Sequence, residues 1–130
     1  MPTQEFTVHV KNQPGSLGRV AQALHSYGVN IISLATEGTR DDGTLKIVTS
    51  DPSSARKALE KEGLEFTVDE IVVASVMNRP GELAKLATKL GHAGINIISV
   101  YLLTDGKFAL RVDKPDQARN LLKETIAATI

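Results

Sequence analysis

Hydrophobic and polar residues alternate over residues 6–10, where the apolar positions are Phe6, Val8 and Val10. A period of two is typical of a strand with one buried face. From Leu17 the apolar residues recur instead at the three- and four-residue spacing of an amphipathic helix. Read in the same way, the following chain predicts strands at residues 29–35, 45–49 and 64–68, and a second helix that starts after residue 51 and ends at Gly63. Residues 71–77 are expected to open a second copy of this order with a further strand.

Local turn and cap residues support these boundaries. Asp51 offers a capping carboxylate and Pro52 follows at the first helical position, which is a common helix start. Asp42-Gly43 is typical of a tight hairpin turn, so we expect the turn between the second and third strands there.

The chain contains an internal repeat. Residues 12–33 read NQPGSLGRVAQALHSYGVNIIS and residues 78–99 read NRPGELAKLATKLGHAGINIIS, and 11 of these 22 positions are identical at an offset of 66. Asp105-Gly106 lies 63 positions after Asp42-Gly43, so the second hairpin is three residues shorter. Lys114 stands where Asp51 stood, so the capping carboxylate is lost in the second copy.

Repetition at a fixed offset indicates two copies of one structural unit. The order β-α-β-β-α-β with right-handed crossovers predicts an α+β fold, with two ferredoxin-like units whose antiparallel sheets carry helices on one face. We expect one unit at residues 1–69 and a second at residues 70–130. The end of the second copy, LKETIAATI, lacks a clear strand pattern, so its fourth strand is expected to be short or missing.

Composition removes several classes of function. Fifteen basic residues balance 15 acidic ones, which argues against nucleic acid as a partner. The chain has no cysteine, so disulfides and thiolate metal sites are excluded. No apolar run is long enough to span a bilayer and the first residues do not resemble a signal peptide, so we expect a cytoplasmic protein without a membrane partner.

The N-x-P-G stretch joins the first strand of each copy to its first helix. Proline is tolerated in the first turn of a helix, and glycine permits a tight turn with close approach of a ligand. The amides at residues 16–18 and 82–84 are expected to lack acceptors within the helix. Such amides, with the helix dipole, suit a carboxylate or phosphate group. A simple turn and helix start would explain the same residues.

The second conserved element of the repeat is G-[VI]-N-I-I-S. Asparagine is disfavoured in strands, yet Asn30 and Asn96 stand at the start of the second strand in each copy. Each side chain could form a turn, or present amide donors and an acceptor to a ligand. The pairing of this element with N-x-P-G in both copies favours a functional role.

Other motifs are weaker. The GSLG stretch at residues 15–18 matches the loop of one class of RNA binder, but the second copy has Ala84 in place of the last glycine. The histidines His9, His25 and His92 show no metal-ligand spacing. The sequence has no nucleophile elbow, Walker loop, dinucleotide fingerprint or other catalytic constellation. We therefore expect no catalytic residues, no metal and no cofactor, and a protein that is not an enzyme. A small enzyme of acylphosphatase type would need a paired Arg and Asn that we do not find.

The combination N-x-P-G-x-L, an apolar-striped helix and G-[VI]-N-I resembles the ACT-domain family of small-molecule-sensing modules. The resemblance covers both halves, so the chain is similar to a tandem ACT protein without an attached enzyme domain. It implies regulatory binding of a free amino acid between two ACT units. The implied ligand-binding residues are Asn12, Pro14, Gly15, Ser16 and Leu17 with Asn30 and Ile31, and Asn78, Pro80, Gly81, Glu82 and Leu83 with Asn96 and Ile97.

The two implied sites differ at one position, because Glu82 stands where the first copy has Ser16. A carboxylate there would compete with a ligand carboxylate for the turn amides, or would favour an ammonium group. Three readings of function remain. In the first, the chain binds an amino acid and acts on a metabolic enzyme or as a homodimer formed through sheet or helix faces. In the second, it is an assembly or regulatory subunit of such an enzyme and binds no ligand. In the third, it is a small enzyme.

Overall fold

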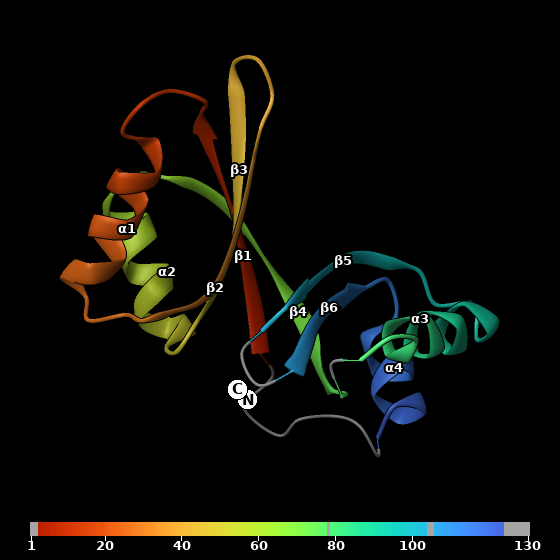
Figure 1. Cartoon of the computed structure of the whole chain (residues 1–130). Coiled ribbons are helices and arrows are strands. Elements are labelled where there is room, and N and C mark those ends of the chain that lie inside the picture. Colours follow the sequence, from red (N-terminus) through yellow and green to blue (C-terminus); the bar gives the residue numbers. More distant parts are fainter. Residues whose placement is uncertain (1–2, 78, 104–105, 124–130) are drawn as a thin grey trace. The chain divides into compact units, whose positions relative to one another are not determined.

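The computed structural model describes residues 3–77, 79–103 and 106–123, and Figure 1 shows their arrangement. The described elements of the first half are β1 (Thr3–Lys11), α1 (Ser16–Ser26), β2 (Ile31–Gly38), β3 (Asp42–Thr49), α2 (Pro52–Lys61) and β4 (Glu65–Ser75). Those of the second half are α3 (Glu82–His92), β5 (Ile97–Leu102), β6 (Lys107–Val112) and α4 (Pro115–Leu121). The α+β class and the repeated ferredoxin-like order are confirmed.

The chain forms two compact units. The N-terminal unit is Gln4–Asp69, and the C-terminal unit combines Thr3 with the chain from Glu70 onward. In the N-terminal unit the strand order is β2-β3-β1-β4, and in the C-terminal unit it is β4-β6-β5. The pairings of β1 with β3, β2 with β3, β4 with β6 and β5 with β6 are all antiparallel. The expected fourth strand of the second copy falls at residues 124–130, outside the described residues.

Each unit has its own hydrophobic core between its helices and one face of its sheet. In the N-terminal unit, Phe6 and Val8 of β1 pack with Val20 and Leu24 of α1 and with Leu59 of α2. Helices α1 and α2 lie side by side (Figure 1). The core of the C-terminal unit follows the same plan and consists of Val72, Ala74, Leu86, Leu90, Ile95, Phe108, Leu110, Val112, Ala118 and Leu122.

Two strands predicted as separate are one. The sequence suggested a strand at residues 64–68 and another opening the second copy at residues 71–77, whereas β4 runs without interruption through Glu65–Ser75. No glycine or proline lies between Leu64 and Ser75, so nothing in the local chemistry ends the strand. The boundary between the two units falls within β4, between Asp69 and Glu70.

The hairpin turn between β2 and β3 lies earlier than predicted. Asp42 and Gly43 belong to β3, and Gly38 pairs with Gly43 across the ladder. The turn is closed by the Thr39 amide, which donates to the Asp42 carbonyl oxygen at 2.8 Å. The ladder extends this far because β1 also pairs with these residues, with Lys11 opposite Asp42. Asp105 of the second predicted turn lies outside the described residues.

The predicted cap of the second helix is confirmed. The Ser54 amide donates to Asp51 Oδ1 at 3.1 Å, and the Ser54 hydroxyl donates to Asp51 Oδ2 at 2.7 Å. These bonds hold the pKa of the Asp51 carboxyl below its ordinary value. In the second copy Lys114 takes the cap position of α4 and makes no side-chain capping bond, as its residue type predicts.

Candidate functional site

Residues 13–15 and 79–81, the x-P-G part of the repeated stretch, form the same turn in both units. Gly15 and Gly81 immediately precede α1 and α3 and have φ angles of 91° and 87°. Residues that carry a side chain rarely adopt this left-handed backbone conformation, so glycine is favoured at both positions. The Arg19 amide donates to the Gly15 carbonyl at 3.0 Å, and the Lys85 amide donates to the Gly81 carbonyl at the same distance. Folding alone therefore accounts for the glycine of both turns.

Helices α1 and α3 begin with amides for which the described residues provide no acceptor. The Ser16 amide donates to the Gln13 carbonyl at 3.3 Å, so it is not available as the sequence suggested. For the next two amides, those of Leu17 and Gly18, the described part of the chain provides no acceptor. The C-terminal unit is equivalent, with a bond from the Glu82 amide to the Arg79 carbonyl at 3.3 Å. Two amides per turn, at the positive end of the helix dipole, can bind a carboxylate.

Leu17 and Leu83 are not core residues. The helical stripe in the sequence included both, but their side chains are 44% and 42% exposed. Val20 and Leu24 supply the buried face of α1 instead. Packing does not require an apolar residue at either exposed position. Core packing therefore does not explain why both copies have leucine there.

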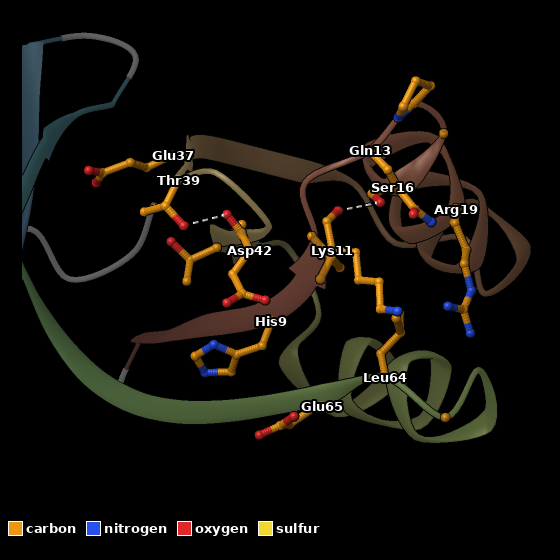
Figure 2. Close-up of a pocket in the computed structure, with 16 residues that line it drawn as sticks. His9, Lys11, Gln13, Ser16, Arg19, Glu37, Thr39, Asp42, Leu64 and Glu65 are labelled. Carbon is orange, nitrogen blue, oxygen red and sulfur yellow. Dashed lines mark hydrogen bonds between the residues drawn. The ribbon is translucent and has the colours of Figure 1, made fainter.

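A surface hollow of about 790 Å³ lies beside the turn of the N-terminal unit (Figure 2). It is bordered by the end of β1, the N-x-P-G turn, the tip of the β2–β3 hairpin and the start of β4. The lining residues with ionisable side chains are His9, Lys11, Arg19, Glu37, Asp42 and Glu65. Gln13, Pro14, Gly15 and Ser16 bring the candidate turn into the same lining. The hollow thus offers positive and negative groups to a ligand of mixed charge.

Three of the lining side chains come from regions that sequence reasoning had not connected with the turn. Lys11 ends β1, Asp42 begins β3, and Leu64 precedes β4. Asp42 had been interpreted only as a turn residue. Figure 2 shows these side chains around one hollow. No sequence pattern joins them, since the hairpin tip and the start of β4 reach the turn only through the sheet pairing.

Asn12 has a structural role that its sequence context did not reveal. Its backbone amide donates to the Asp41 carbonyl at 2.9 Å, and its side-chain Nδ2 donates to the Thr39 carbonyl at 2.5 Å. The side-chain amide of Asn12 also lies directly against Gly38, in the space that a Cβ on Gly38 would occupy. Asn12 therefore fastens the N-x-P-G turn to the hairpin tip. Its counterpart Asn78 lies outside the described residues.

The backbones of Asn30 and Asn96 are held by equivalent hydrogen bonds in the two units. The Asn30 carbonyl accepts a bond from the Ser50 amide at 3.0 Å, and its amide donates to the Ser50 hydroxyl at 3.2 Å. The Asn96 carbonyl accepts from the Asp113 amide at 3.1 Å, and its amide donates to Asp113 Oδ1 at 2.9 Å. Both side chains are exposed. None of these bonds requires an asparagine side chain, so folding leaves the choice of asparagine unexplained.

The isoleucines that follow are placed differently from the asparagines. Ile31 packs against the core of the N-terminal unit and Ile97 against that of the C-terminal unit. The strand register then shifts between Ile31 and Ser33, and again between Ile97 and Ser99. The repeated N-I-I-S stretch thus encodes the same irregularity in both edge strands, a feature that re-aims side chains and is common beside functional sites.

Ser16 and Glu82 differ in their contacts as well as in their charge. The Ser16 hydroxyl donates to the Lys11 carbonyl at 2.7 Å (Figure 2). Glu82 Oε1 instead accepts from Arg79 Nε at 2.9 Å and lies 3.7 Å from Lys85 Nζ. The bond from Arg79 and the charge of Lys85 lower the pKa of the Glu82 carboxyl, which is therefore ionised at neutral pH.

Among the described residues, no group of three or more His, Asp or Glu side chains is placed to hold a metal ion. None of the described helices has the length and apolar character that crossing a membrane requires.

Comparison with known proteins identifies the family of the chain. A family model described as an ACT domain pair matches residues 1–128. A protein of known structure from Bacteroides thetaiotaomicron is 26% identical, with a TM-score of 0.89 over 98% of this chain and 92% of that chain. No curated protein matches the sequence.

Two aspartate kinase structures share the fold at lower identity. The ligand-free regulatory subunit of aspartate kinase from Thermus thermophilus is 18% identical, with a TM-score of 0.69 over 95% of this chain and 92% of that chain. Aspartate kinase from Clostridium acetobutylicum is 14% identical, with a TM-score of 0.63 over 95% of this chain and 33% of that chain. Because the family model spans both repeated units, the chain belongs to the ACT domain pair family.

Proposed function

We propose that this protein is a regulatory module that binds a free amino acid at the hollow of the N-terminal unit. The observation that supports the proposal is that free helix amides and a hollow lined by both positive and negative side chains occur next to each other. The acceptor-free amides of Leu17 and Gly18 follow directly after Ser16, which lines the hollow together with Lys11 and Asp42. An amino acid is a small ligand with one carboxylate and one ammonium group, and this arrangement provides partners for both.

In this proposal the α-carboxylate accepts hydrogen bonds from the two amides, with the Lys11 ammonium group nearby. The α-ammonium group donates to carboxylate and carbonyl oxygens at the hairpin side of the hollow. Charge-assisted bonds of this kind are the stronger class of hydrogen bond. The exposed apolar side chain of Leu17 stands beside the turn, where it can cover an apolar part of the ligand.

A second copy of the chain would complete the site. Family resemblance places the ligand between two ACT units, with the strand-side residues of one unit facing the turn of another. The exposed side chains of Asn30 and Asn96 suit that role, because their backbones are already held by Ser50 and Asp113. We therefore propose a homodimer in which these asparagines contact ligand.

Calorimetric titration of the chain with each of the twenty amino acids tests the proposal. We expect at least one to bind with a Kd at or below about 1 mM, which corresponds to about −4.1 kcal/mol. The Lys11→Met variant should weaken that binding about tenfold or more, since a charged hydrogen bond contributes about 1.5–3 kcal/mol. Lys57→Met is the matched control, because Lys57 is exposed on α2 and is not part of the hollow. Absence of binding by all twenty would refute the proposal.

An assembly subunit without a ligand is the second candidate function. It is favoured by β5, on which Ile98, Val100 and Leu102 are 48%, 42% and 54% exposed. Alternate apolar residues on a strand at the end of a sheet suit a protein interface. Co-purification from the native cell, with and without added amino acids, separates the two functions. A metabolic enzyme that is retained equally in both conditions would support assembly alone.

A further inference from the structure

From Gln13 and Arg79 onward, the two turns have the same backbone hydrogen bonds but different charges. The hydrogen bonds that close them have equal lengths, 3.0 Å and 3.3 Å in both units. Three aligned positions differ in the side chains that surround them: Gln13 against Arg79, Ser16 against Glu82, and Arg19 against Lys85. A difference in ligand binding between the units would therefore come from side chains and not from the path of the chain.

In the C-terminal unit these side chains form an ion cluster across the turn. Glu82 lies between Arg79 at 2.9 Å and Lys85 at 3.7 Å, and its side chain is 17% exposed. Its negative charge stands in the first turn of α3, where it interacts favourably with the helix dipole. The Glu82 carboxylate thus offsets the positive end of the helix dipole and pairs with the two cations. Without it, the dipole and these cations would attract an anionic ligand.

In the N-terminal unit, uncharged Gln13 and Ser16 replace Arg79 and Glu82, and the remaining cation, Arg19, pairs with Glu62. The first turn of α1 has no acidic residue, and the Ser16 hydroxyl is bonded to the backbone of Lys11. Arg19 donates to the carboxylate and the carbonyl of Glu62, at 3.1 Å and 2.8 Å, beyond the end of α2. The first turn of α1 therefore has no carboxylate that would compete with a ligand carboxylate for the amides of Leu17 and Gly18.

We infer that each chain binds one ligand, at the turn of the N-terminal unit, and that Glu82 held by Arg79 and Lys85 excludes a ligand carboxylate from the turn of the C-terminal unit. This inference rests on the proposed function. An ammonium group is not an alternative partner for Glu82, since the carboxylate already has two cations. The exchange of Ser16 for Glu82 is thus the difference that decides which turn admits a ligand carboxylate to its amides.

Backbone amide NMR of the full chain, titrated with each of the twenty amino acids in turn, tests the inference. The amides of Leu17 and Gly18 should shift on binding, while those of Leu83 and Ala84 should not. Calorimetry on the same samples should give one ligand per chain. Removing the charge with Glu82→Ser, or with the isosteric Glu82→Gln, should admit a ligand to the C-terminal turn and raise the ratio to two at saturating ligand. Binding at this turn should be weaker than at the N-terminal turn, because Met77 stands where the N-terminal unit has Lys11.

Two matched variants complete the test. Ser16→Glu introduces the excluding charge in the N-terminal unit and should weaken binding at least tenfold, with the fold checked by circular dichroism. Glu60→Gln removes an exposed carboxylate of α2 that pairs with Arg56 at 3.9 Å, and should leave the ratio at one. Shifts at both turns in the unmodified chain, or a ratio that stays at one in both Glu82 variants, would overturn the inference alone. Absence of any shift would overturn the proposed function together with it.

Discussion

Replacement of Gly38 by alanine tests whether Asn12 fastens the turn to the hairpin. A Cβ on Gly38 would lie 2.8–2.9 Å from three atoms of the Asn12 amide group, which is shorter than a normal contact. The cross-strand partner Gly43 is the matched control, because a Cβ there would meet nothing nearer than 3.6 Å. Neither glycine has a positive φ, so the backbone itself accepts alanine at both positions.

The size of the effect follows from how the clash can be relieved. If Asn12 rotates away, it gives up its bond to the Thr39 carbonyl, a loss of about 0.5–1.5 kcal/mol. If Asn12 stays, the overpacking costs about 1–3 kcal/mol. A compatible Gly→Ala change returns about 0.4–1 kcal/mol by restricting the unfolded chain. Because the clash is relieved by the cheaper route, we expect Gly38→Ala to lower the free energy of unfolding by up to about 1 kcal/mol. Gly43→Ala should leave that free energy unchanged or raise it slightly.

A double-mutant cycle isolates the contact. Asn12→Ala alone should cost about 1 kcal/mol, but in that background Gly38→Ala should cost nothing, because the clashing amide is gone. Urea unfolding followed by circular dichroism measures all four free energies, with the dependence on urea expected to be constant. Additive costs, or equal effects of alanine at Gly38 and Gly43, would show that Asn12 does not fasten the hairpin.

Three further substitutions test the local assignments. Leu24→Ala should lower the free energy of unfolding by about 2–5 kcal/mol while Leu17→Ala changes it by less than about 1, measured by urea unfolding; equal losses would mean that Leu17 belongs to the core. Gly15→Ala should cost about 1–2 kcal/mol because of its left-handed φ, whereas Gly18→Ala, inside α1 and free of close contacts, should stabilise by up to about 1 kcal/mol; thermal unfolding that ranks them otherwise contradicts the turn geometry. The pKa of Asp51 is lowered on folding, so its contribution to stability is present above the unfolded pKa of about 3.9 and is lost as pH falls through the lower folded value. The Asp51→Asn variant should therefore lose less stability than the unmodified chain when urea unfolding is compared at pH 5 and below pH 3; equal losses would contradict this.

The contrast between Asn12 and Asn30 changes how the repeat is interpreted. Both are conserved between the two copies of the stretch, and the sequence placed both in the ligand site. The side chain of Asn12 is used within the fold, whereas that of Asn30 is exposed and only its backbone is held. A repeated residue can thus be retained for a contact across the fold, and only the structure separates such a residue from one that faces a partner or ligand.

The sequence by itself determined the features that depend on a few neighbouring residues. Alternation and helical spacing placed the helices and most strands, Asp51 capped α2, and Pro-Gly specified the turn before α1 and α3. The repeat also gave the duplicated order of elements and the family. Each of these follows from bonds and packing within about one turn of chain, so the local residue types are sufficient to predict them.

Only the tertiary structure decided what depends on pairing between distant segments. Strand β1 extends the ladder to Asp42 and moves the hairpin turn to residues 39–41, and β4 continues through Asp69 and Glu70 as one strand. The same pairing brings Lys11, the hairpin tip and the start of β4 around one hollow. It also decides that Leu17 is exposed. Register and burial are properties of neighbouring segments, and a periodic pattern gives which faces are apolar but not what covers them.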